Sequence, residues 1–293
     1  MKIKDSLSRR IFVVCNYALL ALLGIACFLP MWHVLCCSIS DPVVLAREGG
    51  IRLLPVAPFS LAGYKAVLGY RNIVTGYLNT LFYVIVGVAV NLLLTTMAAY
   101  VLSRKRFLPG RVIMILLTFT MLFNGGLIPL YLVFVRLNLI DTRAAVVLCT
   151  AFNVFNMVIL RTSFMSIPEA LEESARLDGA NDLTILFRIV LPLSKASVAV
   201  ITLFVAVAIW NSWFAAAIYL MDRSKWPIQM FLREVLINNS QKSLESGAKA
   251  SAIELQILVK YAIILVATIP ILCIYPFMQK YFVKGVLIGS VKG

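Results

Sequence analysis

The polar residues within the long apolar runs of this sequence include amides, hydroxyls and aromatics. Tryptophan rings can stack on the faces of a sugar, and an asparagine amide can hydrogen-bond its hydroxyl groups, so these side chains are candidates for the wall of a pathway. Tryptophans also anchor helices at membrane interfaces, and asparagines often join one helix to another. Both alternatives stay open for the candidate pathway residues, which are Asn79, Asn124, Tyr131, Asn153, Asn156, Trp210, Asn211 and Trp213.

The same apolar runs contain no aspartate or glutamate. A charge at the centre of a membrane helix costs ~2.5–3.5 kcal/mol on insertion scales, so acids occur there mainly for proton or sodium coupling. His33 is the only histidine, which leaves almost no material for a histidine-based metal site, proton relay or catalytic cluster. The sequence therefore argues against a secondary transporter and a membrane enzyme, and favours a passive pore or a transporter driven from outside the chain.

A second group of chemistry-bearing residues lies in an acid-rich segment, residues 166–193. Ser166 and Glu169 stand at the spacing of a capping box, in which two side chains satisfy the free backbone N–H groups at a helix start. Pro168 falls in the first turn, where its missing N–H costs nothing. The pattern therefore predicts a helix that begins near Ile167.

Charged and small residues continue along this helix to a predicted turn. Glu172 and Glu173 precede Arg176 by four and three residues, which predicts ion pairs along one helix face. Gly179 can adopt the left-handed conformation that ends a helix. Either residue of the Asn181-Asp182 pair can cap a following helix.

The second helix of the segment is predicted to be short and amphipathic, and Pro192 is expected to end it. Its apolar face would consist of Leu183, Leu186, Phe187 and Val190. Residue spacing alone allows two interpretations of the resulting helix-turn-helix: a connector lying on the membrane surface, or a docking element for another protein.

The elements that carry both groups are expected to be helices in lipid. Of 293 residues, 61% are hydrophobic and 14% charged, with a mean hydropathy of +0.94, far more apolar than an average soluble domain. The apolar runs are also too long and too unalternating for barrel strands. The expected fold is all-α and polytopic, with six transmembrane helices at 11–35, 77–102, 112–135, 144–164, 198–221 and 259–277.

Basic residues set the expected orientation of these six spans. The tail before Ile11 is basic, and the link 103–111 carries four Lys/Arg and no acid, so the positive-inside rule places both, and hence both termini, in the cytosol. The expected layout is a cytosolic tail at 1–10, a first span at 11–35, an extracytoplasmic segment at 36–76, a core at 77–281 with the cytosolic segment 166–193 and an extracytoplasmic loop at 222–258, and a cytosolic tail at 282–293.

Residues 166–193 carry a recognisable motif. The series Glu173-Ser174-Ala175, Asp178-Gly179-Ala180 and Ile189-x-Leu191-Pro192 resembles the EAA motif of binding-protein-dependent importer permeases, with Ser174 in place of the first alanine. Further stretches extend the resemblance, over nearly the whole chain, to carbohydrate permeases of the maltose-transporter type and their complex-oligosaccharide subgroup. These are 58–64, 79–81, 125–131, 139–142, Trp210-Asn211 and 282–293.

That resemblance implies a type I ABC importer permease fold, in which the EAA turn is a coupling helix seated in a groove of a cytosolic ATPase. It also implies a second, usually different, permease subunit, two ATPase copies, an extracellular solute-binding protein, and alternating-access import of an oligosaccharide or other carbohydrate. The chain has no Gly-x-x-x-x-Gly-Lys-Ser/Thr loop, so ATP and Mg would be bound by the ATPase and no cofactor by this chain. The implied ATPase-coupling residues are Glu172, Glu173, Ser174, Ala175, Arg176, Asp178, Gly179 and Ala180.

The net charge of +14 does not indicate a nucleic-acid partner, because no compact basic domain exists to carry one. Basic residues also collect at cytosolic helix ends and near anionic lipid. The expected location is a bacterial or archaeal cell membrane, with the chain crossing it several times and contacting lipid. An ABC importer permease for a non-sugar solute is the main alternative, with a secondary transporter behind it.

Overall fold

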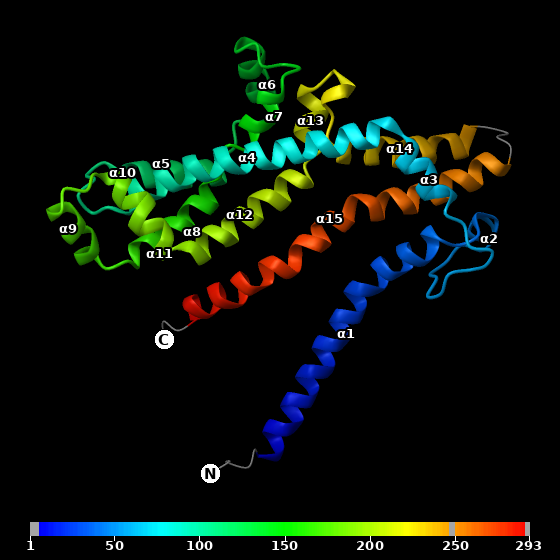
Figure 1. The fold of residues 1–293 in the computed structure, drawn as a ribbon, viewed down its shortest axis with the longest axis horizontal. Helices are drawn as coiled ribbons and strands as arrows, with labels where there is room; N and C mark the ends of the chain where they lie inside the picture. Colours follow the sequence, from blue (N-terminus) through cyan, green and yellow to red (C-terminus); the bar gives the residue numbers. More distant parts are fainter. Residues whose placement is uncertain (1–5, 246–249, 291–293) are drawn as a thin grey trace. The chain divides into compact units, whose positions relative to one another are not determined.

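The computed structural model describes residues 6–245 and 250–290, and every regular element in those residues is helical (Figure 1). The chain begins with α1 (Leu7–Ser38), α2 (Pro42–Glu48), α3 (Ala62–Gly69), α4 (Arg71–Ser103), α5 (Gly110–Leu122) and α6 (Leu127–Arg136). It continues with α7 (Arg143–Cys149), α8 (Val154–Met165), α9 (Glu169–Leu177), α10 (Asp182–Ile185), the π-helical turn η1 (Leu186–Val190) and α11 (Leu191–Leu193). The last elements are α12 (Lys195–Trp210), α13 (Phe214–Tyr219), η2 (Arg223–Lys225), α14 (Ile228–Glu245) and α15 (Ala250–Ser290).

The all-helical expectation is confirmed for this part of the chain. Portions of three expected segments lie outside the described residues: 1–5 of the N-terminal tail, 246–249 of the 222–258 loop, and 291–293 of the C-terminal tail.

Three stretches in the described residues are long and apolar enough to cross a membrane, namely Leu7–Ser38, Asn72–Ser103 and Glu254–Ile274. The first of them carries large apolar side chains on its surface; Leu22, for example, is 64% exposed. Such a surface requires an apolar solvent, and a helix of this length is more than long enough to cross a bilayer. The number of spans rises to as many as six if each of three bent helix pairs crosses as one unit.

The bent pairs differ from the straight spans that hydropathy predicts. α5 and α6 meet at 113°, α7 and α8 at 54°, and the stretch Asp182–Leu193 meets Lys195–Trp210 at 88°. Single helices were expected over 112–135, 144–164 and 198–221, and α12 instead ends at Trp210. Hydropathy reports how apolar a run is, but a helix breaks where local side chains replace its backbone hydrogen bonds.

Residues 1–71 and 232–268 form one compact unit. In it, α3 lies against α15 so closely that a Cβ on Gly63 would lie 2.7 Å from the Leu258 carbonyl oxygen, which only glycine allows. The hydroxyls of Ser38 and Tyr64 lie 2.7 Å apart. These contacts join the end of α1 to α3, and α3 to α15.

Residues 72–231 and 269–293 form the second unit, which carries the acid-rich segment. A large apolar cluster in this unit has contributions from α4, α8, α10, η1 and α12, which include the buried side chains of Met157, Phe164, Ile185 and Ile201. Within this unit, Figure 1 shows α9 and α10 beside the connection from α4 to α5. The acid-rich segment is therefore anchored on the core through α8 and α10.

Candidate functional site

The turn after α9 is built as a Schellman motif, the left-handed cap that closes many helices. The N–H of Gly179 donates to the Arg176 carbonyl at 3.0 Å, and the N–H of Ala180 donates to the Ala175 carbonyl at 2.9 Å. These two bonds satisfy carbonyl groups that the end of a helix leaves free. Gly179 has a φ of +84°, as expected from its type, so the backbone turns sharply just before α10.

The turn is open on its outer side. A Cβ placed on Gly179 would meet no atom within 4 Å, so glycine is required there by its backbone conformation and not by crowding. Asn181 then caps α10, since its side-chain oxygen accepts the Thr184 N–H at 2.8 Å. The predicted helix, turn and second cap are confirmed in this region.

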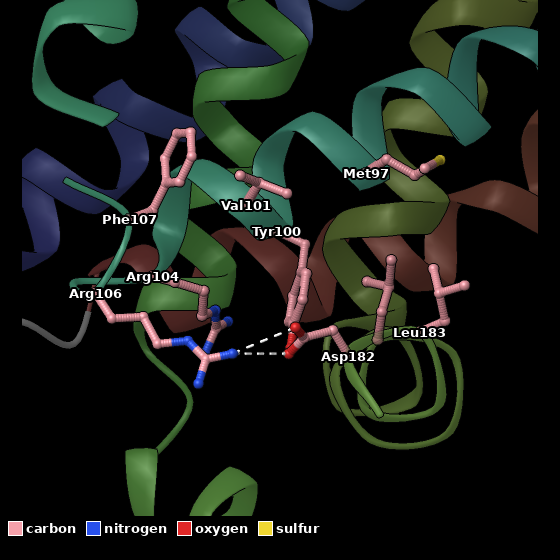
Figure 2. Close-up of a pocket in the computed structure, with 9 residues that line it drawn as sticks. Met97, Tyr100, Val101, Arg104, Arg106, Phe107, Asp182 and Leu183 are labelled. Carbon is pink, nitrogen blue, oxygen red and sulfur yellow. Dashed lines mark hydrogen bonds and ion pairs between the residues drawn. The ribbon is translucent and has the colours of Figure 1, made fainter. Parts of the chain in front are cut away.

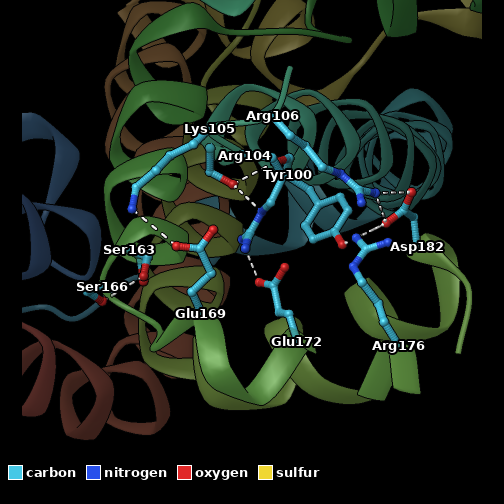
Figure 3. Close-up of polar contacts among 11 residues, drawn as sticks. Tyr100, Arg104, Lys105, Arg106, Ser163, Ser166, Glu169, Glu172, Arg176 and Asp182 are labelled. Carbon is cyan, nitrogen blue, oxygen red and sulfur yellow. Dashed lines mark hydrogen bonds and ion pairs between the residues drawn. The ribbon is translucent and has the colours of Figure 1, made fainter. Parts of the chain in front are cut away.

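Three consecutive basic residues, Arg104 to Arg106, hold the segment from the α4–α5 connection (Figure 3). Arg104 pairs with Glu172, Lys105 Nζ lies 3.1 Å from a Glu169 oxygen, and Arg106 lies 3.3 Å from Asp182. Acids from both α9 and α10 thus meet one short basic stretch. The α4–α5 connection and the acid-rich segment are thus held together although they lie more than 60 residues apart in the sequence.

The three contacts differ greatly in burial. The side chains of Arg104 and Glu172 are 15% and 6% exposed, whereas those of Lys105 and Glu169 are 85% and 62% exposed. The Arg104 guanidinium also lies over the Tyr100 ring, 4.7 Å from its centroid. Burial is the largest influence on Arg104 and lowers the pKa of its guanidinium. The arginine nevertheless stays charged at neutral pH, so Glu172 is the buried acid that offsets its charge.

Asp182 joins the two arms of the turn. It accepts hydrogen bonds from Arg176 on α9 and from Arg106, and the Tyr100 hydroxyl donates to it at 3.4 Å. Burial opposes ionisation of this carboxyl, but the hydrogen bond and charge of Arg176, together with Arg106, outweigh it and hold the pKa of Asp182 below its usual range.

Two local expectations about α9 are wrong. The helix begins at Glu169 with the extended residue Pro168 as its N-cap, and the Ser166 hydroxyl donates to the Ser163 carbonyl instead of forming a capping box. The expected pairs of Glu172 and Glu173 with Arg176 are replaced by longer-range partners, since Glu172 pairs with Arg104 and Arg176 with Asp182. Tertiary contacts of buried groups outweigh i,i+4 surface pairs, which contribute only a few tenths of a kcal/mol.

The second helix ends at Leu193, one residue beyond the predicted end at Pro192. Pro192 lies in the first turn of α11, directly after the π-helical turn η1, where its missing N–H is not needed. The sharp bend comes two residues later, at Ser194. The predicted apolar face is likewise divided: Leu186 and Val190 are buried, but Leu183 and Phe187 are 57% and 49% exposed.

The predicted coupling residues divide into an inner and an outer set. Glu172 and Arg176 point toward the basic connection and its acid partners (Figure 3), and Ala175 and Ala180 pack against the core. The outward set comprises Glu173, Ser174, Asp178 and Gly179, all exposed. Sequence reasoning missed Leu177, which is 90% exposed at the same tip; a large apolar residue directly before the Asp-Gly turn was the available signal.

A pocket of about 390 Å³ lies between the end of α4 and α10 (Figure 2). Met97, Val101 and Leu183 give it an apolar wall, and Arg106 and Asp182 close one side with their ion pair. The pocket is thus bounded by groups that already hold the acid-rich segment in place.

The predicted pathway residues fall partly at the helix breaks. The Asn124 side chain accepts the Gly126 N–H at 2.9 Å, that of Asn153 accepts the Asn156 N–H at 3.0 Å, and Asn211 donates to the Val207 carbonyl at 3.0 Å. Each amide replaces backbone bonds lost at a break. All three asparagines are exposed at the surface of this chain.

The other predicted pathway residues are mostly enclosed. Asn79 is buried, donates to the Ser224 and Trp226 carbonyls, and accepts from Arg143 at 2.9 Å. Asn156 is 8% and Trp210 5% exposed. The remaining rings stack within the chain, Tyr131 on Tyr219 and Trp213 edge-on to Phe214. The structure therefore does not gather the eight residues into one cavity, and their role as pathway residues stays a prediction.

Residues 91–288, including the whole of the acid-rich segment, match the model of the binding-protein-dependent transport system inner membrane component family. The chain belongs to this family. It is a multi-pass membrane protein and a permease subunit of an ABC importer, not an enzyme.

The similarity to its relatives extends over nearly the full length of the chain. The polygalacturonan/rhamnogalacturonan transport system permease protein YtcP of Bacillus subtilis is 42% identical over 98% of this chain and 100% of its own. Protein LplC of the same organism is 41% identical over 97% and 96%. Among solved structures, a chain from a bacterial ABC transporter involved in the import of the acidic polysaccharide alginate superposes with a TM-score of 0.85 and 34% identity, covering 96% of this chain and 100% of that one.

Sequence reasoning also missed the role of the basic connection. Arg104, Lys105 and Arg106 entered only as a topology signal, yet each pairs with an acid of the acid-rich segment. The sequence did hold a signal for these pairs, namely the complementary charges of the basic link 103–111, which has no acid, and the acid-rich segment 166–193.

Proposed function

We propose that this permease forms one half of a translocation pathway for an oligosaccharide and receives its driving force through the turn at 178–181. The observation that carries the proposal is the coupling segment itself: an exposed tip closed by a Schellman motif and held to the core by three ion contacts. Such a tip offers a fixed, rigid surface to a partner.

The connections of the tip give it two routes into the membrane part. One route runs through Glu172 and Arg104 to the end of α4, because that pair is buried. The other runs through α10, η1 and α11 to the 88° bend before α12. A displacement of the tip would therefore shift both α4 and α12, as expected of a two-state element that a nucleotide-driven partner biases.

In this proposal the three long helices, the bent pairs α5–α6 and α7–α8, and α12 make six spans, with both termini in the cytosol. The basic connection beside the coupling segment supports the orientation through the positive-inside rule. The three exposed breaks at Asn124, Asn153 and Asn211 support a pathway shared with a second permease subunit, because non-helical backbone at membrane depth is stable only against protein or a water-filled cavity.

The proposed assembly contains this chain, a second and different permease subunit, two copies of a cytosolic ATPase that bind ATP and Mg, and an extracellular solute-binding protein. The carbohydrate assignment is supported by the names of the relatives, several of which transport oligosaccharides or polysaccharides. Uronate-containing oligosaccharides are the preferred class, since YtcP and the alginate transporter both act on acidic polysaccharides.

The coupling proposal is tested in vesicles containing the assembled importer. Gly179→Val forces a β-branched residue into φ +84°, and Asp178→Lys reverses the charge of the tip. Both variants are expected to reach the membrane but to lose ATP hydrolysis stimulated by substrate and binding protein. Gly24→Val is the matched control, because its Cβ also meets no atom within 4 Å. Undiminished stimulation in both tip variants would refute the proposal.

The substrate class is tested by uptake of matched oligogalacturonates and neutral oligosaccharides of equal length into the same vesicles. Preference for the acidic sugars is expected. Uptake of amino acids or peptides, but not of either sugar, would favour the importer of a non-sugar solute.

A further inference from the structure

A groove of about 820 Å³ adjoins the basic connection and shares Arg104 and Phe107 with the pocket beside Asp182. It is formed by the end of α4, the connection to α5, the first half of α5, and α8. All its lining residues lie within the unit of residues 72–231. The groove takes no part in the coupling contacts described above, apart from sharing Arg104 and Lys105.

One end of the groove is strongly basic. Four of its lining residues are cationic, and no lining residue is acidic. Within the described residues, neither Arg111 nor Arg161 has an acidic partner, and Lys105 has only the exposed contact with Glu169. Arg161 is oriented by its Nε, which donates to the Leu102 carbonyl at 2.7 Å. This end can therefore accept an anion without first breaking a buried ion pair.

The remainder of the groove is apolar and runs along one face of α5. Met114, Ile115, Thr118 and Phe119 follow one another at helical spacing on this face. Ile115 and Phe119 are 62% and 54% exposed, and Leu108 at the basic end is 89% exposed. From Arg111 to Phe119 the face is ~12 Å long.

We infer that this groove is a binding site for an anionic phospholipid, with its phosphate at Arg111, Arg161 and Lys105 and an acyl chain along α5. The charge pattern selects this occupant. A soluble anion would leave the apolar half exposed, and a partner helix would have to bring acids into the membrane, where they are costly. Basic grooves at the cytoplasmic ends of membrane helices suit anionic lipid headgroups. Only the assignment to the cytosolic leaflet rests on the proposed function.

The test measures lipid retained by the full-length chain, purified with its accompanying subunits, in native mass spectrometry with phosphatidylglycerol or phosphatidylcholine. Preference for phosphatidylglycerol is expected. The double variant Lys105→Gln/Arg111→Gln should bind phosphatidylglycerol about 25-fold more weakly. Each basic residue near an anionic lipid surface contributes a factor of about five to the affinity, and two are removed. Arg188→Gln/Lys195→Gln is the matched control, because both of these bases are exposed and lie outside the groove.

A third variant separates groove shape from charge. Thr118→Trp fills the apolar half without changing net charge, and should also lower phosphatidylglycerol retention. Equal losses in the two double variants would overturn the inference, because they would show general attraction without a site. Crosslinking of an Ile115→Cys variant to a second membrane subunit would overturn it too, since a protein would then fill the groove.

Labelling of a Leu108→Cys variant by an impermeant thiol reagent reports the side of the membrane. Labelling from outside, with lipid preference intact, would reject the proposed orientation and retain the site. Labelling only from inside, with no preference for phosphatidylglycerol, would reject the site and retain the orientation.

Discussion

The buried pair of Arg104 and Glu172 gives the sharpest prediction about the coupling segment. In the Glu172→Leu variant, the guanidinium of Arg104 stays in a site where it is only 15% exposed, without its counter-charge. Breaking a buried ion pair in this way typically costs ~3–5 kcal/mol. The Arg104 side chain retains its contact with the Tyr100 ring, and its Nη2 already lacks a hydrogen-bond partner in the described residues. We therefore expect a loss near ~3 kcal/mol, at the lower end of that range.

Two companion variants make the prediction specific. Glu169→Leu removes the neighbouring acid of the exposed pair with Lys105, for which ~0–1 kcal/mol is expected. Arg104→Met combined with Glu172→Leu removes both charges from the buried site. Since replacing a whole buried ion pair by apolar groups is often neutral, this double variant should recover most of the loss.

Hydrogen exchange of the purified protein in lipid nanodiscs is the appropriate assay, because it reports local opening of α9 separately from global unfolding. A loss of ~3 kcal/mol corresponds to a roughly 150-fold rise in the opening equilibrium. The effect should be confined to residues 169–185 and be accompanied by weaker substrate-stimulated ATP hydrolysis. The reasoning is refuted if Glu172→Leu and Glu169→Leu behave alike, or if the double variant opens more than Glu172→Leu.

Gly63→Ala should strongly reduce membrane yield and thermal stability, since its Cβ would meet backbone atoms of Leu258 at 2.7–2.8 Å; Gly87→Ala should be milder, because its close contact is the far end of a flexible side chain. Equal effects would contradict this. Asn181→Ala should cost ~1 kcal/mol by removing the cap of α10, seen as faster exchange at 182–185, and Asn181→Asp should largely restore protection. The pKa of Asp182 is lowered in the folded protein, so its ion pairs stabilise the turn at pH values above the unfolded-state pKa of ~3.9. That contribution is lost as the pH falls through the folded-state pKa. Hydrogen-exchange protection at 176–185, corrected for intrinsic exchange rates, should therefore fall on acidification in the wild type but less in Asp182→Asn. The same loss of protection in both proteins would contradict this prediction.

Local chemistry made much of the acid-rich segment predictable. The left-handed turn at Gly179 and the cap at Asn181 follow from the conformations and hydrogen bonds that single residue types favour. The helical class followed from composition, because only helices satisfy their own backbone over such long apolar runs. The family resemblance rested on motif residues, and the comparison over residues 91–288 bears it out.

Pairings between distant parts of the chain were not predictable in the same way. The choice of Arg104 over Arg176 as the partner of Glu172 depends on which side of α9 faces the core, and that is decided by packing of the whole unit. The same holds for the π-helical turn that directly precedes α11 and Pro192.

The sequence by itself determined an apolar helical chain with an acid-rich turn and, elsewhere in the chain, a basic connection. The tertiary structure alone decided that these two stretches hold each other, that Leu177 and Gly179 stand outward, and that a second face of the basic connection opens into an apolar groove. The physical reason is that residue type and spacing act over a few residues, whereas burial, and with it the strength of a charge contact, exists only once distant elements have packed together.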